Sequence, residues 1–307
     1  MSYFNDNDFD VFKSCNILRN ESDIRQARKV IKDKLLDINE DINQKMNDIG
    51  LYHHKDTAHI VSLLTPCEFN HGKVNWVGIR YGKHPSEIDE LNFGADKEDI
   101  YGFQKHCCFQ LDVCYSGVEM GIFHAVPRGS IDRMYCHQML DSGDADFKSR
   151  LIKAVEGIVG YGFVWNVGVD GLSMDDFKGD SFVFDEVEDV GEEFVKWYSK
   201  VDCEYRYSSL LCHYGRKDER ISSIEGIEDE FFKVVERLRG LYDVMCWRKL
   251  WGGIFRVGQW RCICPKIQNI CSLFGKLAPP NICLFYNFQI STEHLFYKKV
   301  VPFFYVN

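Results

Sequence analysis

Residues 106–134, HCCFQLDVCYSGVEMGIFHAVPRGSIDRM, bring together side chains that could carry out chemistry. Two carboxylates, Asp112 and Glu119, lie in runs where apolar and polar residues alternate. Alternation with period two predicts strands, and Ser116-Gly117 between two such runs predicts the turn of a β-hairpin. One face of this hairpin would carry Asp112, Cys114 and Glu119. The core face would carry Leu111, Val113, Met120 and Ile122.

The predicted register suggests a metal site. With Ser116 and Gly117 as the turn, Cys114 pairs with Glu119 and Asp112 pairs with Gly121. Diagonal neighbours on a sheet lie roughly 7–8 Å apart, so Asp112 and Glu119 could share a divalent cation through water. A metal-dependent nuclease would also place a lysine two residues after the second carboxylate, and this chain has Gly121 there. The alternative is a solvent-exposed polar face without a metal ion.

Further titratable side chains flank the hairpin and widen the set of catalytic candidates. A histidine beside a carboxylate can act as a general base. His124, however, continues the inward phase of Met120 and Ile122, which favours a buried histidine at the strand end. The candidate catalytic residues are His106, Asp112, Glu119, His124, Asp132 and Arg133. The sequence leaves open whether they catalyse a reaction.

The chain lacks the strong motifs of several enzyme classes. It contains no G-x-x-x-x-G-K-[ST], G-x-G-x-x-G, G-x-S-x-G or H-E-x-x-H sequence. We therefore expect no cofactor. Cys262 and Cys264 are weak candidates for metal ligands, together with Asp112 and Glu119. Structural zinc prefers two to four residues between paired cysteines, and a single residue separates this pair.

Composition predicts a soluble cytoplasmic protein. The chain has 307 residues, of which 45% are hydrophobic and 27% charged, as in an ordinary globular protein. No apolar run is long enough for a transmembrane helix. The acidic start MSYFNDNDFDVFK does not resemble a secretory signal. We therefore expect the 13 cysteines to be reduced thiols.

Hydrophobic periodicity predicts helices and strands intermixed along the chain. The clearest helix covers residues 22–49, where isoleucine and leucine recur at three- and four-residue steps, with Ser22 as the N-cap and Gly50 after the end. Further helices are predicted at 145–159, 188–200 and 227–245, and strands at 74–82 and 161–169. No glycine-rich strand-to-helix crossover is present, which favours an α+β fold with an antiparallel or mixed sheet around the central hairpin.

A change of composition predicts a domain boundary after residue 245. Residues 246–307 carry eight basic residues and one acidic residue, a net charge of +7, against −16 for residues 1–245. This basic tail is rich in aromatic residues and cysteine and lacks clean periodicity, so we expect it to pack less well. Aromatic side chains beside cationic ones can bind single-stranded nucleic acid. The tail could therefore contact nucleic acid or a protein partner.

Three short segments resemble the YktB-like proteins, a small group of cytosolic proteins. They are DFDVF at residues 8–12, KHCCFQLDV at residues 105–113 and FFKVVERLRGLYDVM at residues 231–245. The resemblance covers roughly residues 8–245. It implies an α+β fold with a curved sheet and helices mainly on one side. The Arg-Arg and Pro-Pro run of that family is not recognisable near residues 60–75, and the resemblance transfers no catalytic residue.

These observations favour a non-catalytic binding or accessory module. A metal-dependent hydrolase or nuclease centred on residues 106–133 is the first alternative. Nucleic-acid binding through the basic tail is the second.

Overall fold

The structure is a computed structural model, and it describes residues 2–54, 64–66, 72–91, 106–124, 131–168, 179–202 and 207–248. The chain divides into two units, Met1–Arg248 and Lys249–Asn307. The second unit lies outside the described residues. The prediction that the basic tail packs less well than the body falls on it, except for residues 246–248.

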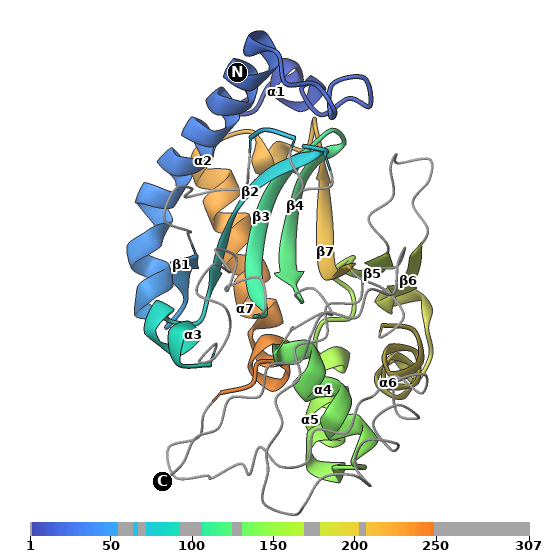
Figure 1. Cartoon of the computed structure of the whole chain (residues 1–307). Helices are drawn as coiled ribbons and strands as arrows, with labels where there is room; N and C mark the ends of the chain where they lie inside the picture. The colour runs from blue at the N-terminus through green and yellow to red at the C-terminus, as the bar shows by residue number, and fades with distance from the viewer. Residues whose placement is uncertain are drawn as a thin grey trace, which may run out of the picture. The chain divides into compact units, whose positions relative to one another are not determined.

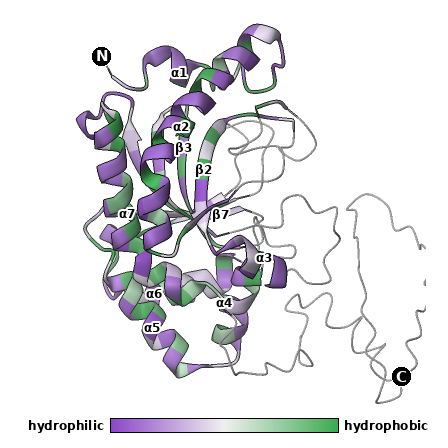
Figure 2. Cartoon of the chain, turned by 90° about the vertical axis from the view of Figure 1, so that its left-hand side faces the viewer, coloured by the Kyte–Doolittle hydropathy of each residue, from purple (hydrophilic) through white to green (hydrophobic). Residues whose placement is uncertain are grey.

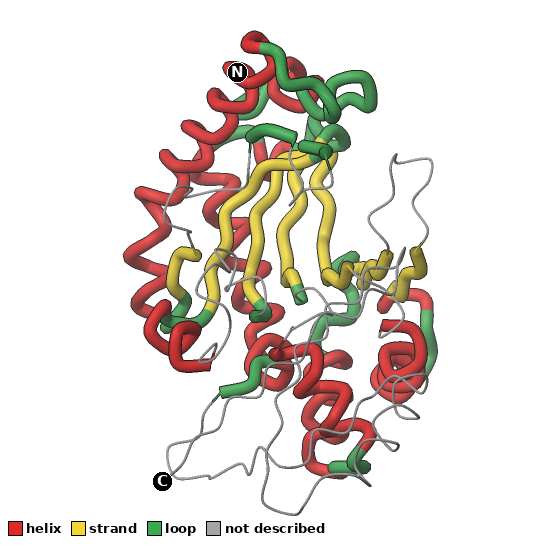
Figure 3. The backbone as a smooth tube through the Cα atoms, viewed as in Figure 1, coloured by secondary structure: helices red, strands yellow, loops and turns green. Residues whose placement is uncertain are grey.

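The first unit is built on an antiparallel sheet of seven strands in the order β1-β2-β3-β4-β7-β5-β6 (Figure 1; Figure 3). The predicted α+β fold with an antiparallel sheet is confirmed, and the hairpin β3–β4 occupies its centre. The strands are β1 (Tyr52–His54), β2 (Trp76–Gly82), β3 (Cys108–Cys114), β4 (Gly117–Phe123), β5 (Val164–Gly168), β6 (Gly179–Val183) and β7 (Tyr207–Gly215).

The described part of the chain contains seven α-helices. They are α1 (Asp6–Asp10), α2 (Ser22–Asp48), α3 (Pro85–Leu91), α4 (Ile131–Asp141), α5 (Ala145–Glu156), α6 (Val190–Val201) and α7 (Ile224–Met245). Their colouring by hydropathy shows hydrophilic and hydrophobic residues alternating along α2 and α7 (Figure 2). In the described residues no helix combines the length and the apolar character that a membrane crossing requires.

Helices α2, α6 and α7 pack on one face of the sheet. Aromatic rings show this directly: Tyr81 of β2 lies 6.0 Å from Phe231 of α7, and Phe109 of β3 lies 4.9 Å from Tyr242 of α7, both between ring centroids. The ring centroid of Trp165 in β5 lies 5.2 Å from that of Phe194 in α6. We call this side the helix face and the opposite side the polar face.

Helix α2 follows the predicted pattern closely. Ile31, Leu35, Ile38 and Ile42 are completely buried, because steps of three and four residues keep them on one side of the helix. The helix begins at Ser22 with Glu21 at the N-cap position, one residue before the predicted cap. The predicted glycine after the helix end has a φ of 74°, a left-handed conformation that favours glycine.

The faces of the central hairpin are confirmed, but its predicted register is wrong. Cys114 pairs with Gly117 and Asp112 pairs with Glu119, so Tyr115 and Ser116 form the turn. The register differs by two residues from the prediction. Because side chains alternate with period two, a shift of two changes the partners and keeps the faces. All four predicted core residues are completely buried: Leu111, Val113, Met120 and Ile122.

Gly117 belongs to strand β4 rather than to the turn. It has a φ of 151°, and a Cβ atom there would overlap the carbonyl oxygen of Tyr214 in β7. The glycine is therefore required by the close approach of β7, which the sequence analysis did not predict as a strand. β7 pairs with β4 on one side and β5 on the other, and so joins the two halves of the sheet.

Replacing Leu35 with Ala should destabilise the protein by about 2–5 kcal/mol, because the leucine side chain is completely buried between α2 and the sheet. Chemical unfolding followed by far-ultraviolet circular dichroism measures this change. Glu40→Ala, on the exposed side of the same helix, is the control. Equal stability of the two variants would contradict the docking of α2.

Candidate functional site

The first group of candidate residues surrounds Asp132, in the first turn of α4. Lys83, directly after β2, places its Nζ 2.6 Å from Asp132 Oδ1 and 3.0 Å from His106 Nδ1. The backbone N–H of Cys107 donates to Asp132 Oδ2 at 2.6 Å, and that of Trp247 donates to Oδ1 at 2.8 Å. Lys83, His106 and Asp132 are completely buried. We call this group the Asp132 network.

The charges of the Asp132 network neutralise each other. Burial acts to raise the pKa of Asp132, but the Lys83 ammonium and the neighbouring His106 outweigh burial and hold the pKa at about 2. Burial also opposes the charge of Lys83, yet Asp132 keeps the pKa of Lys83 above its usual value. Burial lowers the pKa of His106. Lys83 and Asp132 therefore form a charged pair at neutral pH, beside a neutral histidine.

The second group surrounds Asp202, directly after α6. Arg133 follows Asp132 in α4, but its side chain leaves the helix in another direction. Arg133 donates through Nε to Asp202 Oδ2 at 3.0 Å, and His137 Nε2 lies 2.9 Å from the same oxygen. The hydroxyl of Ser208 donates to Asp202 Oδ1. We call this group the Asp202 network.

His124 lies beside the Asp202 network. Its Nε2 is 2.7 Å from the hydroxyl oxygen of Tyr198, whose ring stacks on His137 with the centroids 4.7 Å apart. Burial lowers the pKa of His124 to about 3, so the imidazole is neutral at pH 7. The predicted inward orientation is confirmed, since the side chain is completely buried.

Both networks fasten α4 to its neighbours and offer little to a substrate. A general base needs a free acceptor within reach of the proton that it removes. The Asp132 and Asp202 carboxylates already accept hydrogen bonds from cationic side chains and have no exposed surface. Their arrangement is that of ion pairs that hold secondary-structure elements together.

The third group lies on the polar face, where Asp112 and Glu119 are direct cross-strand partners. Asp112 is only 4% exposed, and its Oδ1 has no hydrogen-bond partner among the described residues. Burial raises the pKa of Asp112 to about 7. A Cβ atom at Gly78 of β2 would overlap this carboxylate, so the glycine makes room for it. The alternative of a solvent-exposed polar face is therefore wrong at Asp112, which is buried.

Arg80 is a positive charge on this face that acts on Asp112. Its NH2 group donates to Gln110 Oε1 at 3.1 Å. Its guanidinium carbon lies 4.5 Å from the ring centroid of Trp76 and 4.9 Å from that of Phe123, within cation–π distance. The charge of Arg80 lowers the pKa of Asp112 by less than burial raises it.

The polar face becomes more accessible at Glu119. The side chain of Glu119 is 32% exposed and that of His213, its cross-strand neighbour on β7, is 43% exposed. Single donor atoms of Cys114, Glu119 and His213 all lie within 4.8 Å of one another. The nearby carboxylate of Glu119 raises the pKa of His213. Three side chains of metal-ligating types therefore meet here.

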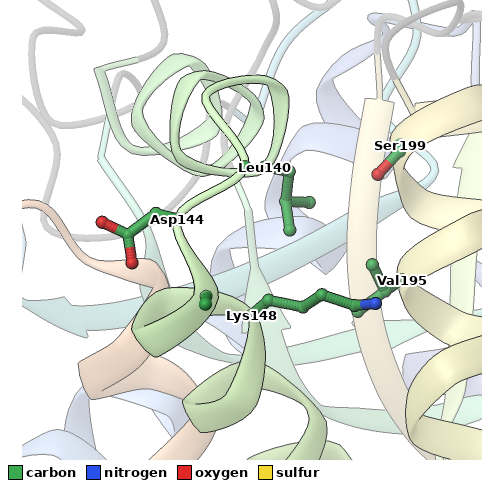
Figure 4. A pocket seen from close by; sticks show the side chains of 7 residues that line it. Leu140, Asp144, Lys148, Val195 and Ser199 are labelled. Carbon is green, nitrogen blue, oxygen red and sulfur yellow. The ribbon is translucent and has the colours of Figure 1, made fainter.

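A depression of about 300 Å³ lies elsewhere, beside the first turn of α5 and along α6 (Figure 4). The side chain of Lys148 extends across it toward Val195. Asp144 at its rim accepts the N–H of Phe147 as the N-cap of α5. The residues that line this depression include no catalytic or metal-ligand candidate, so it does not define the candidate site.

The structure therefore divides the six catalytic candidates among three groups. His106 and Asp132 share the first, Arg133 and His124 belong to or adjoin the second, and Asp112 and Glu119 form the third. The sequence analysis missed three residues that complete these groups: Lys83, Asp202 and His213. The partners of these residues are distant in sequence. Only for His213 could a local signal have helped, namely the alternation of side chains along β7. Cys262 and Cys264 lie outside the described residues.

Comparison with protein-family models and with curated protein sequences finds no match to this chain.

Asp132→Asn should destabilise the protein by about 3–5 kcal/mol, because it leaves the buried ammonium of Lys83 without its counter-charge. Urea unfolding at neutral pH measures the effect. Asp141→Asn, at the exposed end of the same helix, is the matched control and should change stability by less than about 0.5 kcal/mol. If both variants unfold at the same urea concentration, the ion pair does not stabilise the fold.

Asp112→Asn should stabilise the protein at high pH and lose this advantage at low pH. The folded-state pKa of Asp112, about 7, exceeds its ordinary value of 3.8, so the native state holds a proton that the unfolded chain releases. Wild-type stability therefore falls as pH rises between these values, and the amide variant escapes that loss. We expect a gain on the order of 2–4 kcal/mol near pH 8 and little gain near pH 4.

Unfolding free energies measured across this pH range test the expectation. Glu156→Gln, at an exposed position of α5, should follow the wild-type pH profile. A difference between Asp112→Asn and wild type that does not vary with pH would contradict the raised pKa.

Proposed function

We propose that this protein is a non-catalytic binding module whose polar face binds a divalent cation beside Asp112 and Glu119. The two carboxylates are direct partners across β3 and β4, and one Asp112 oxygen has no hydrogen-bond partner among the described residues. Neighbouring carboxylates repel each other, and a cation removes that repulsion. Carboxylate oxygens are also common ligands of divalent cations. This pairing is the observation that supports the proposal.

The non-catalytic part of the proposal follows from how the other candidates are used. His106 and Asp132 are enclosed with Lys83, and Arg133 is bonded to Asp202. Breaking either ion pair to take up a substrate would leave a buried charge uncompensated, which is costly. We infer that these residues stabilise the fold and do not bind a substrate.

The hydrolase or nuclease hypothesis shares the Asp112–Glu119 pair and needs a general base beside the metal ion. Both histidines proposed for that role have other partners: His106 contacts Lys83, and His124 contacts Tyr198. Metal-dependent cleavage of a nucleic acid or ester that disappears in Glu119→Gln would favour the hydrolase over the module.

We also propose a family relationship and a cellular location for this protein. The α+β fold agrees with what the YktB-like resemblance implies, and we keep that relationship as a hypothesis. The described cysteines that carry free thiols, seven in number, support a reducing, cytoplasmic location. Binding of nucleic acid or a protein by the basic tail stays a hypothesis, because residues 249–307 lie outside the described part of the chain.

Isothermal titration of the full-length protein with Zn²⁺, Mn²⁺, Ca²⁺ and Mg²⁺ tests the cation site. We expect at least one of these ions to bind, and Glu119→Gln to weaken that binding by about tenfold or more. Glu156→Gln on α5 is the matched control and should bind like the wild type. Absence of binding by the wild type, or equal binding by Glu119→Gln, would refute the proposed function.

A further inference from the structure

We propose that Cys114 and His213 complete the cation site with Glu119 and make it selective for a transition metal of the Zn²⁺ class. This inference rests on the proposed function, because it assigns further ligands and a metal class to the same polar face. It adds β7 to a site that the sequence places on the hairpin alone.

The strand register brings the three ligands together. Glu119 of β4 pairs directly with His213 of β7, and Cys114 ends the neighbouring strand β3 opposite Gly117. Gly117 and Glu119 are two residues apart on β4, so Cys114, the partner of Gly117, projects from the same face as Glu119. The three ligands therefore come from the adjacent strands β3, β4 and β7. His213 Nδ1 lies 3.8 Å from Glu119 Oε1, and the sulfur completes a set of donors within 4.8 Å of one another.

The spacing is close to what a tetrahedral ion requires. Bonds of about 2.0–2.3 Å to zinc place neighbouring ligand atoms roughly 3.3–3.8 Å apart. Closing the observed set onto an ion therefore needs shifts on the order of 1 Å. The exposed fractions of Glu119 and His213, 32% and 43%, leave their side chains room to rotate. Sheet hydrogen bonds fix the backbone beneath them.

The donor types select the metal. A thiolate, a carboxylate and an imidazole suit Zn²⁺ and its neighbours in the transition series, whereas Mg²⁺ and Ca²⁺ prefer oxygen ligands alone. On binding, the Cys114 thiol gives its proton to solvent and its sulfur bonds to the ion. The thiolate and the Glu119 carboxylate then balance the two positive charges. The Ser116 hydroxyl, 3.2 Å from Cys114 Sγ, is placed to donate to that sulfur.

Glycines beside the ligands leave a coordination position open. Gly117 and Gly215 pair with each other next to Cys114 and His213, so neither position places a side chain over the ion. A Cβ atom at Gly215 would meet no other atom within 4 Å. Asp112 lies beside this set but is not among its donors, so three protein ligands leave a fourth position for water or for a ligand atom of a bound partner.

Titration of the full-length protein with Co²⁺ tests the ligand set, because thiolate coordination produces a charge-transfer band in the near ultraviolet. We expect this band in the wild type, its displacement by Zn²⁺ and its persistence in excess Mg²⁺. Cys114→Ser should abolish the band, and His213→Gln should weaken Co²⁺ binding by roughly 100-fold. Thermal unfolding tests whether each variant is folded. If Cys114→Ser does not fold, the result for His213→Gln decides the outcome.

Two controls separate this site from other thiols. Cys15→Ser removes an exposed cysteine of the first unit, and the double variant Cys262→Ser/Cys264→Ser removes the pair in the basic tail. Both should keep the wild-type band. Its loss in the double variant, or its retention in Cys114→Ser, would overturn the inference.

The same measurements distinguish failure of the inference from failure of the proposed function. Cation binding that is lost in Glu119→Gln but unchanged in Cys114→Ser and His213→Gln would leave the proposed function standing and refute the added ligands. Cation binding that does not depend on Glu119 would refute both.

Discussion

The buried ion pair between Lys83 and Asp132 is the constraint on which much of the remaining structure depends. Two charges without exposed surface are tolerated only when each has partners. Asp132 takes its partners from the end of β2, from the backbone before β3 and from the backbone after α7, and it is itself carried by α4. One carboxylate thus fixes four segments that are far apart in the chain.

Helix α4 transmits this constraint to the other half of the sheet. Arg133 is adjacent to Asp132 in sequence, but it binds Asp202 at the end of α6. The Ser208 hydroxyl connects Asp202 to β7 and accepts a hydrogen bond from Trp165 of β5. The two networks therefore hold α4 between the hairpin side and the β5–β6 side of the sheet. Asp132 and Arg133, two of the catalytic candidates, thus form ion pairs that hold the fold together.

The polar face differs from the two networks, because its polar groups do not all have hydrogen-bond partners among the described residues. Asp112 keeps an oxygen without a described hydrogen-bond partner, and burial raises its pKa to about 7. An apolar residue or an amide at this position would be less costly at neutral pH. Proteins retain such unfavourable groups mainly where they serve binding or catalysis. In this respect the polar face contrasts with the Asp132 and Asp202 networks, whose carboxylates all accept hydrogen bonds from cationic side chains.

Periodicity in the sequence was sufficient to predict α2, the hairpin faces and the α+β class, because these follow from contacts between residues a few positions apart. It could not determine which residues meet across the fold. Asp132 lies 49 positions from Lys83, and Arg133 lies 69 positions from Asp202. The glycine at position 117 is required by the carbonyl of Tyr214 in β7, which is 97 positions away along the chain. Only the tertiary structure could decide these pairings, since a local pattern carries no information about which distant strand or helix will complete a buried charge or a ligand set.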